Sequence, residues 1–198
     1  MSSGEIWLVR HGETSWSLDG RHTGCTDVPL TAEGERQGEA VGRRLAGRVF
    51  ARVLTSPLTR AVETARRAGY GAVAEVDADL HEWDYGEYEG RTTADIRREA
   101  PGWSVWTRDP PGGETAERVG ERAGRVIERC AVAGGDVALF AHGHFLRVLA
   151  ATWLGLPPRA GCYLALGTAT ISILGHEHET RVVSEWNESC DLLAVPLP

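Results

Sequence analysis

The sequence lacks any apolar run that could cross a bilayer. No stretch of the 198 residues approaches the roughly 20 apolar residues that a membrane-spanning helix needs. The first residues, Met1–Glu5, also lack the basic and apolar regions of a secretory signal peptide. We therefore expect a cytoplasmic protein without a membrane partner.

Cysteine is scarce, and positive charge is in the minority. The four cysteines are scattered, with no CxxC pair and no Cys/His metal spacing, so we expect reduced thiols, no metal site and no cofactor. The formal net charge of −7 argues against nucleic acid or an anionic membrane surface as a partner. An anionic substrate would have to be attracted by a local cluster of arginines.

The chain also contains no repeat, linker or low-complexity tract. Its 198 residues, 21.5 kDa and 42% hydrophobic content fit a single domain over 1–198 with a sizeable core. No interface pattern stands out, so the sequence leaves the oligomeric state open.

Apolar periodicity predicts alternating strands and helices. Strands are expected at 6–9, 52–55, 73–76, 136–141, 168–174 and 181–186. Helices are expected at about 31–47, 56–68, from 114 to beyond 130, and 144–154. This order implies a three-layer α/β/α sandwich with a mostly parallel central sheet and one antiparallel strand.

Three local patterns refine this prediction. Gly34, Gly38 and Gly42 recur on one face of the first long helix, which we expect to lie close against the sheet. Ser56 and Pro57 fit the N-cap and first position of the second helix. Residues 83–112 hold many Trp, Tyr, Gly and Pro with little periodicity, which is typical of a lid-like insertion.

The most informative local feature is Arg10-His11, directly after the first apolar strand. The carboxyl ends of strands in open α/β sheets are where ligands bind. A neutral imidazole can attack a phosphoryl group whose charge a guanidinium neutralises. Taken alone, the pair could also be a solvated turn.

Four further motifs follow in a set order, and together with the first they resemble the histidine phosphatase superfamily, the phosphoglycerate mutase-like enzymes. The matching segments are Arg10-His11-Gly12-Glu13-Thr14, the stretch from Gly20 to Gly34, Thr55–Ala65, Leu80–Gly86 and Ala141-His142-Gly143-His144. The resemblance implies a phosphoglycerate mutase-like fold.

The resemblance also implies roles for five residues. His11 is expected to accept the phosphoryl group as a phosphohistidine, with its other ring nitrogen donating to a backbone carbonyl. Arg10, Arg60 and His142 are expected to hold the transferring phosphoryl oxygens. Glu82 is expected to protonate the leaving group, and Asp84 is its nearby rival.

Other residues are candidates for binding the substrate. The expected substrate-side groups are Ser17, Arg21, Thr23, Glu89, Gly143 and His144. Ser17 departs from the asparagine that many members carry there. The aromatic and histidine candidates for the cavity mouth are Trp16, His22, Trp83, Tyr85, Tyr88 and Trp103. Arg147 is expected to be a structural ion-pair partner.

The chain is short for a mutase, and several segments are most similar to broad-specificity acid phosphatases and sugar-bisphosphate phosphatases. We therefore expect metal-independent hydrolysis of small phosphorylated metabolites. Two alternatives stay open: a cofactor-dependent phosphoglycerate mutase, and a non-catalytic module that binds phosphorylated ligands.

Overall fold

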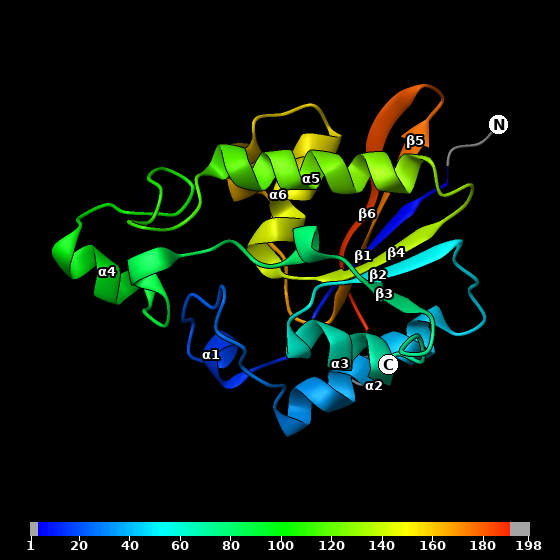
Figure 1. Ribbon diagram of the computed structural model, residues 1–198, viewed down its shortest axis with the longest axis horizontal. Helices are drawn as coiled ribbons and strands as arrows, with labels where there is room; N and C mark the ends of the chain where they lie inside the picture. The colour runs from blue at the N-terminus through cyan, green and yellow to red at the C-terminus, as the bar shows by residue number, and fades with distance from the viewer. Residues whose placement is uncertain (1–3, 191–198) are drawn as a thin grey trace, which may run out of the picture.

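A six-stranded sheet forms the centre of the computed structural model, which describes residues 4–190 (Figure 1). The strands are β1 Ile6–Arg10, β2 Arg52–Thr55, β3 Ala74–Val76, β4 Val137–Ala141, β5 Thr170–Glu177 and β6 Thr180–Ser189, in the spatial order β3-β2-β4-β1-β5-β6. Among the strands of residues 4–190, only β5 runs against the others, since it pairs antiparallel with both β1 and β6. The predicted sheet, mostly parallel with one antiparallel strand, is confirmed.

Helices cover both faces of this sheet. They are α1 Ser15–Leu18, α2 Ala32–Leu45, α3 Thr59–Arg67, α4 Thr93–Glu99, α5 Ala116–Ala131 and α6 Gly143–Trp153, with three short 3₁₀ helices, η1 Ala78–Leu80, η2 Gly86–Tyr88 and η3 Pro158–Tyr163. Figure 1 shows α5 and α6 on one side of the sheet, and α2 and α3 on the other. No helix within the described residues has the length and apolar character needed to cross a membrane.

The alternation of side chains along β1 explains the three layers. Ile6 and Leu8 point into the core shared with α5 and α6, whereas Trp7 and Val9 point into the core shared with α2 and α3. Because both faces of the strand are covered, it reads as a continuous apolar run. The three-layer α/β/α prediction is confirmed.

The predicted start of α3 was wrong. The helix begins at Thr59, with Leu58 at the N-cap and no side-chain capping bond. Ser56 instead extends the sheet, because its backbone N–H donates to Phe140 O at 2.9 Å. Asp27, 32 residues away in sequence, accepts from both the backbone N–H and the hydroxyl of Thr59. A remote carboxylate therefore replaces the local serine cap.

The glycine face of α2 packs closely, but not against the sheet as expected. A Cβ on Gly34 would lie 2.1 Å from Glu13 O, and one on Gly38 would lie 2.9 Å from Arg67 Cβ. A Cβ on Gly42 would lie 3.0 Å from Ala68 Cα. The small residues therefore allow α2 to approach α3 and the loop after β1.

The segment 83–112 is more regular than the sequence predicted. It contains η2 and α4, and α4 begins with a capping box in which Thr92 and Asp95 bond reciprocally. Ile96 and Trp103 are fully buried, so this segment has its own attachment to the core. Figure 1 shows α4 projecting away from the sheet, on the side where α1 lies. The strand-like bridge between Arg21 and Thr92 ties it to the loop after α1.

Candidate active site

The site forms where neighbouring parallel strands end. β1 lies beside β4 and β4 beside β2, so the residues that follow these three strands meet at one edge of the sheet. His11 follows β1, Ser56 follows β2 and His142 follows β4. The sequence could place each at a strand end, and the strand order brings them together.

His11 has a fixed tautomer. Its Nδ1 lies 2.7 Å from Gly12 O, and a carbonyl oxygen can only accept, so Nδ1 carries the proton and Nε2 keeps its lone pair. The side chain is buried. Burial, followed by the charges of Arg60 and Arg10, holds the pKa of His11 well below its usual value. His11 is therefore a neutral imidazole with an available Nε2.

Arg10 supplies a guanidinium with an unused donor. Its Nη1 donates to Leu166 O, and its Nε is buried without a hydrogen-bond partner in the part of the chain that the structure describes. A Cβ on Gly143 would lie 3.2 Å from Arg10 Nε and Cζ, so the missing side chain lets α6 begin against the guanidinium. An oxyanion at this point would satisfy the buried Nε–H and meet the positive end of α6.

Arg60 lies behind His11 rather than in the open cavity. It is fully buried, and its Nη1 donates to Thr26 O at 2.9 Å while Nη2 donates to Thr23 O and Gly24 O. Its Nε donates to His142 Nδ1 at 3.2 Å. The guanidinium therefore holds the 23–26 loop and the second histidine in place.

His142 is likewise neutral and enclosed. Because Arg60 can only donate, His142 Nδ1 is the acceptor, so Nε2 carries the proton and donates to Ser56 Oγ at 2.7 Å. The pKa of His142 lies well below its usual value, because of burial and then the charge of Arg60. The His11 and His142 rings are 5.1 Å apart between centroids. The structure thus brings the predicted histidine pair together.

Glu82 reaches the cavity from the loop after η1. Its Oε1 accepts from the backbone N–H groups of Trp83 and Phe145, and its Oε2 accepts from that of His144. Two of these donors belong to the first turn of α6. The rival carboxylate, Asp84, does not line the cavity and caps the turn at Gly86 instead. Of the two acids, Glu82 is the one that lines the cavity.

A buried ion pair supports the Glu82 loop from behind. Arg122 of α5 pairs with Glu114 at 2.8 Å, and both side chains are almost fully buried. Arg122 also donates to the carbonyls of Asp79, His81 and Glu82. No local pattern singles out this arginine, because its partners come from two other segments of the chain.

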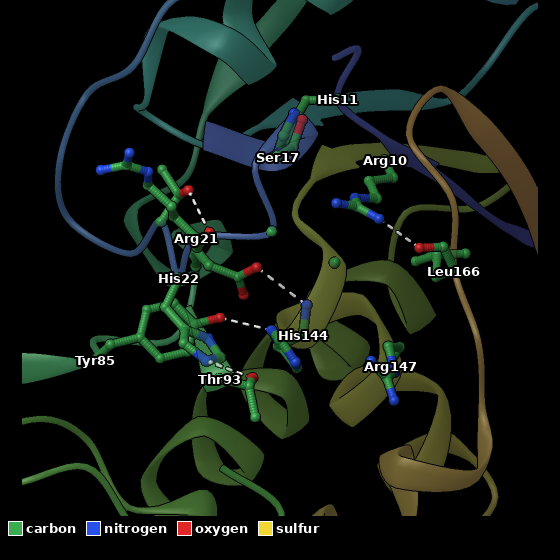
Figure 2. Close-up of a pocket in the computed structure, with 14 residues that line it drawn as sticks. Arg10, His11, Ser17, Arg21, His22, Tyr85, Thr93, His144, Arg147 and Leu166 are labelled. Carbon is green, nitrogen blue, oxygen red and sulfur yellow. Dashed lines mark hydrogen bonds between the residues drawn. The ribbon is translucent and has the colours of Figure 1, made fainter. Parts of the chain in front are cut away.

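The cavity in front of these groups has a volume of about 250 Å³ (Figure 2). It is lined by Arg10, His11, Ser17, Gly20, Arg21, His22, Thr23, Glu82, Tyr85, Thr93, Gly143, His144, Arg147 and Leu166. Five of the six predicted substrate-side residues are among them. Arg60 and His142 are not, so their predicted contact with the phosphoryl oxygens stays a prediction.

Glu89 is the substrate-side candidate that lies elsewhere. It does not line the cavity, and its Oε1 accepts from the backbone N–H groups of Gly24 and Thr26. Through the carbonyls of the same loop it is linked to Arg60. Glu89 therefore shapes the loop that carries Thr23.

The two predicted hydroxyl groups are occupied by local bonds. Ser17 Oγ accepts from Thr14 N–H and donates to Thr14 O within the capping box of α1. Thr23 Oγ1 donates to Arg21 O at 3.0 Å. Each hydroxyl proton already has an acceptor, although both residues line the cavity.

His144 and Tyr85 form the wall next to Glu82. Tyr85 Oη lies 2.6 Å from His144 Nδ1, a bond drawn in Figure 2. Burial raises the pKa of Tyr85 well above its usual value and lowers that of His144, so a neutral phenol donates to a neutral imidazole. The His22 ring packs against Tyr85, with 4.7 Å between centroids and a tilt of 48°, and contacts Thr93 of α4.

The sequence reasoning missed several lining residues and misread one. Thr93 and Leu166 arrive from distant segments, and no local pattern marks them. Arg147 was expected to form an ion pair, but within residues 4–190 it has no carboxylate partner. Its place one helical turn after Gly143 was the signal that could have assigned it to the cavity.

Comparisons with known proteins identify relatives of this chain over most of its length. The sequence model described as the histidine phosphatase superfamily (branch 1) matches residues 6–189. An acid phosphatase of Mycobacterium tuberculosis is 43% identical over 180 residues, covering 89% of this chain and 88% of the relative. A sedoheptulose 1,7-bisphosphatase of Saccharomyces cerevisiae is 37% identical, covering 78% and 69%. A probable phosphoglycerate mutase of Klebsiella pneumoniae is 34% identical, covering 92% and 89%.

The fold has a close match among solved structures. The product of an open reading frame of Mycobacterium tuberculosis superimposes with a TM-score of 0.90 at 40% identity. The match covers 94% of this chain and 98% of the solved one. The similarity therefore extends over the sheet, both helical layers and the segment that carries α4.

Proposed function

Because the chain belongs to the histidine phosphatase superfamily, we propose that it hydrolyses phosphate monoesters of small metabolites through a phosphohistidine on His11. The observation that carries the proposal is the tautomer of His11. Nδ1–H is bound to Gly12 O, which leaves the lone pair of Nε2 for attack at phosphorus in a cavity that also holds Arg10 and Glu82.

In the first half-reaction, Nε2 of His11 forms a bond to phosphorus as the ester P–O bond breaks. Glu82 delivers a proton to the departing oxygen, which leaves as a neutral alcohol. The unpaired Nε–H of Arg10 and the backbone N–H of Gly143, at the start of α6, stabilise charge on the non-bridging oxygens, since the next two N–H groups of the helix bind Glu82. These donors are in place before substrate arrives, so little reorganisation is needed.

In the second half-reaction, water attacks phosphorus and the Nε2–P bond breaks. Glu82, now a carboxylate, takes a proton from that water, which restores the starting state of the enzyme. Arg60 and His142 have a supporting role, because neither lines the cavity. The charge of Arg60 opposes protonation of His11, which preserves the nucleophile.

The choice of water over a second substrate as the acceptor rests on relatives. The acid phosphatase relative has a higher identity than the probable mutase, 43% against 34%. The retained set of Arg10, His11, Arg60, Glu82 and His142 argues against a module that only binds phosphorylated ligands.

The decisive experiment is a phosphate-release screen on the pure protein. p-Nitrophenyl phosphate, sugar phosphates, sugar bisphosphates and phosphoglycerates are tested beside a mutase assay. We expect phosphate release and a phosphoenzyme that is stable in alkali and labile in acid. Phosphoryl transfer between phosphoglycerates without phosphate release would establish the mutase instead. No turnover and no phosphoenzyme with any ester would leave only a binding module.

A further inference from the structure

Gly12 provides the carbonyl that fixes the tautomer of His11, and two side chains hold the peptide groups on either side of it. The backbone N–H of Gly12 donates to Thr64 Oγ1 of α3 at 3.0 Å. The backbone N–H of Glu13 donates to the amide oxygen of Gln37, in α2, at 2.8 Å. Neither side chain takes part in the proposed reaction.

The bond from Gln37 acts on the same peptide group that receives the His11 proton. Glu13 N–H and Gly12 O belong to one peptide unit. That unit accepts from His11 Nδ1 at 2.7 Å and donates to Gln37 Oε1 at 2.8 Å. Hydrogen bonds in such a chain polarise one another, so the glutamine makes Gly12 O a better acceptor. A better acceptor draws the Nδ1 proton away from the ring and leaves more electron density on Nε2.

Thr64 holds the neighbouring peptide from the other helix. It is buried, and its hydroxyl donates to Arg60 O, one turn earlier in α3, at 2.7 Å. The hydroxyl proton is thereby committed, and a lone pair of Oγ1 faces Gly12 N–H. Because Arg60 also bonds His142, Thr64 links the backbone beside the nucleophile to the residue that supports the second histidine.

Glycine at position 12 makes such support necessary. Glycine lacks a Cβ, so its backbone rotates more freely than that of other residues. A Cβ on Gly12 would lie 2.3 Å from Gly34 O, because α2 packs directly on the turn after β1. Close packing therefore requires the most flexible residue next to the nucleophile, and the two side chains restrict that flexibility.

We propose that Gln37 and Thr64 are positioning residues for the nucleophile. By holding the peptides on either side of Gly12, they keep its carbonyl on Nδ1 of His11, which leaves Nε2 unprotonated and directed at phosphorus. Figure 1 shows α2 and α3, which carry the two residues, on one face of the sheet. The inference rests on the proposed function, since it concerns the same nucleophile.

The first test reads the tautomer of His11 by NMR of ¹⁵N-labelled protein without substrate. Wild type should show the Nδ1–H form alone. Removing an acceptor by Gln37→Met or Thr64→Val should let the ring populate both neutral tautomers, because the bond at one ring nitrogen decides which nitrogen is protonated. The spectrum of His11→Ala, which lacks the His11 signals, assigns them. Gln37→Glu and Thr64→Ser keep an oxygen at each position and should retain the wild-type tautomer.

The second test measures, by rapid quench, the rate constant and the substrate affinity for phosphoenzyme formation from p-nitrophenyl phosphate. Gln37→Met and Thr64→Val should lower the rate constant roughly 5- to 20-fold and change the affinity less than about twofold. A misdirected nucleophile slows attack but removes no contact with the substrate. Gln37→Glu and Thr64→Ser should stay within about threefold of wild type.

Thr152→Val is the matched control. Thr152 lies near the end of α6, and its hydroxyl is buried without a hydrogen-bond partner among residues 4–190. The substitution removes a buried threonine hydroxyl, as Thr64→Val does, but away from the nucleophile. It should leave the tautomer of His11 and the rate of phosphoenzyme formation as in wild type.

A single Nδ1–H tautomer with an unchanged rate in Gln37→Met or Thr64→Val would overturn the role of that residue, as would a loss confined to substrate affinity. Gln37 is only half-buried, so Gln37→Met carries the test if Thr64→Val fails to fold. A wild-type protein that shows the expected tautomer but forms no phosphoenzyme from any ester would contradict the proposed function and leave the NMR result standing.

Discussion

Arg122 and Glu114 form a buried ion pair, 2.8 Å apart, directly behind the loop that carries Glu82. Arg122 also donates to three carbonyls of that loop, at Asp79, His81 and Glu82. Glu114 in turn accepts from the backbone N–H of Asp84. The pair therefore sets the position of Glu82 without touching the cavity.

Arg122→Gln is expected to impair the protonation step selectively. A displacement of the Glu82 loop should lower kcat roughly 10- to 100-fold for an alkyl phosphate, and much less for p-nitrophenyl phosphate, whose leaving group needs little protonation. Rates for a series of esters with graded leaving groups measure this. Arg44→Gln, which breaks the distant pair with Glu188, controls for lost ion pairing. A uniform loss across the series would reduce Arg122 to a purely structural role.

Glu82→Gln tests the acid directly. The amide keeps the size of the side chain but cannot deliver a proton, so we expect an alkyl phosphate to lose roughly 100-fold or more in kcat/KM and an aryl phosphate far less. The same ester series is the measurement. Asp84→Asn is the comparison, because Asp84 lies outside the cavity lining. If Asp84→Asn showed the selective loss instead, the rival acid would be the right one.

His11→Ala is expected to abolish both turnover and phosphoenzyme, a loss of roughly 1,000-fold or more, because it removes the imidazole lone pair that attacks phosphorus. Radiolabelled phosphate trapped on the denatured protein is the readout. Labelling that persists in His11→Ala would move the nucleophile, with His142 examined first. Its Nε2 would then have to release Ser56.

Activity is also expected to survive a chelator. The described part of the chain has no group of three or more His, Cys, Asp or Glu side chains arranged to hold a metal ion. Phosphate release is measured before and after dialysis against EDTA, and we expect no change. Loss of activity that added Mg²⁺ restores would contradict the mechanism.

The sequence predicted the parts of the molecule that depend on local pattern. Apolar periodicity predicted all six strands within a few residues, and the helix expected from 114 to beyond 130 is α5. Short motifs led to His11 and Glu82, which line the cavity as expected. Both kinds of signal are contained within a few neighbouring residues.

The predictions failed where a residue's hydrogen-bond partners come from a distant segment of the chain. Ser56 has the local character of an N-cap, but it bonds to His142 while Asp27 caps the helix. Glu89 sits in a motif-rich region, yet it binds the backbone of the 24–26 loop. The α4 helix could have been found from its Thr92–Asp95 capping box.

Acid is expected to destabilise the fold through its buried histidines, and His22 offers the clearest test. Burial lowers the pKa of His22 from 6.5 to about 4. Between these two values the unfolded chain binds a proton that the folded chain does not, so the free energy of unfolding falls as the pH falls. One such group contributes about 1.4 kcal/mol per pH unit, roughly 3 kcal/mol in all.

Urea unfolding at intervals from pH 7 to pH 4 measures this dependence. His22→Gln should be less stable than wild type at pH 7, because it loses the ring contact with Tyr85, but its stability should fall less steeply with acid. The control is His178→Asn. His178 is exposed in the β5–β6 turn at a φ of 54°, which asparagine tolerates, so its slope should match wild type. Parallel curves for wild type and His22→Gln would show that His22 titrates alike in the folded and unfolded chains, against the burial argument.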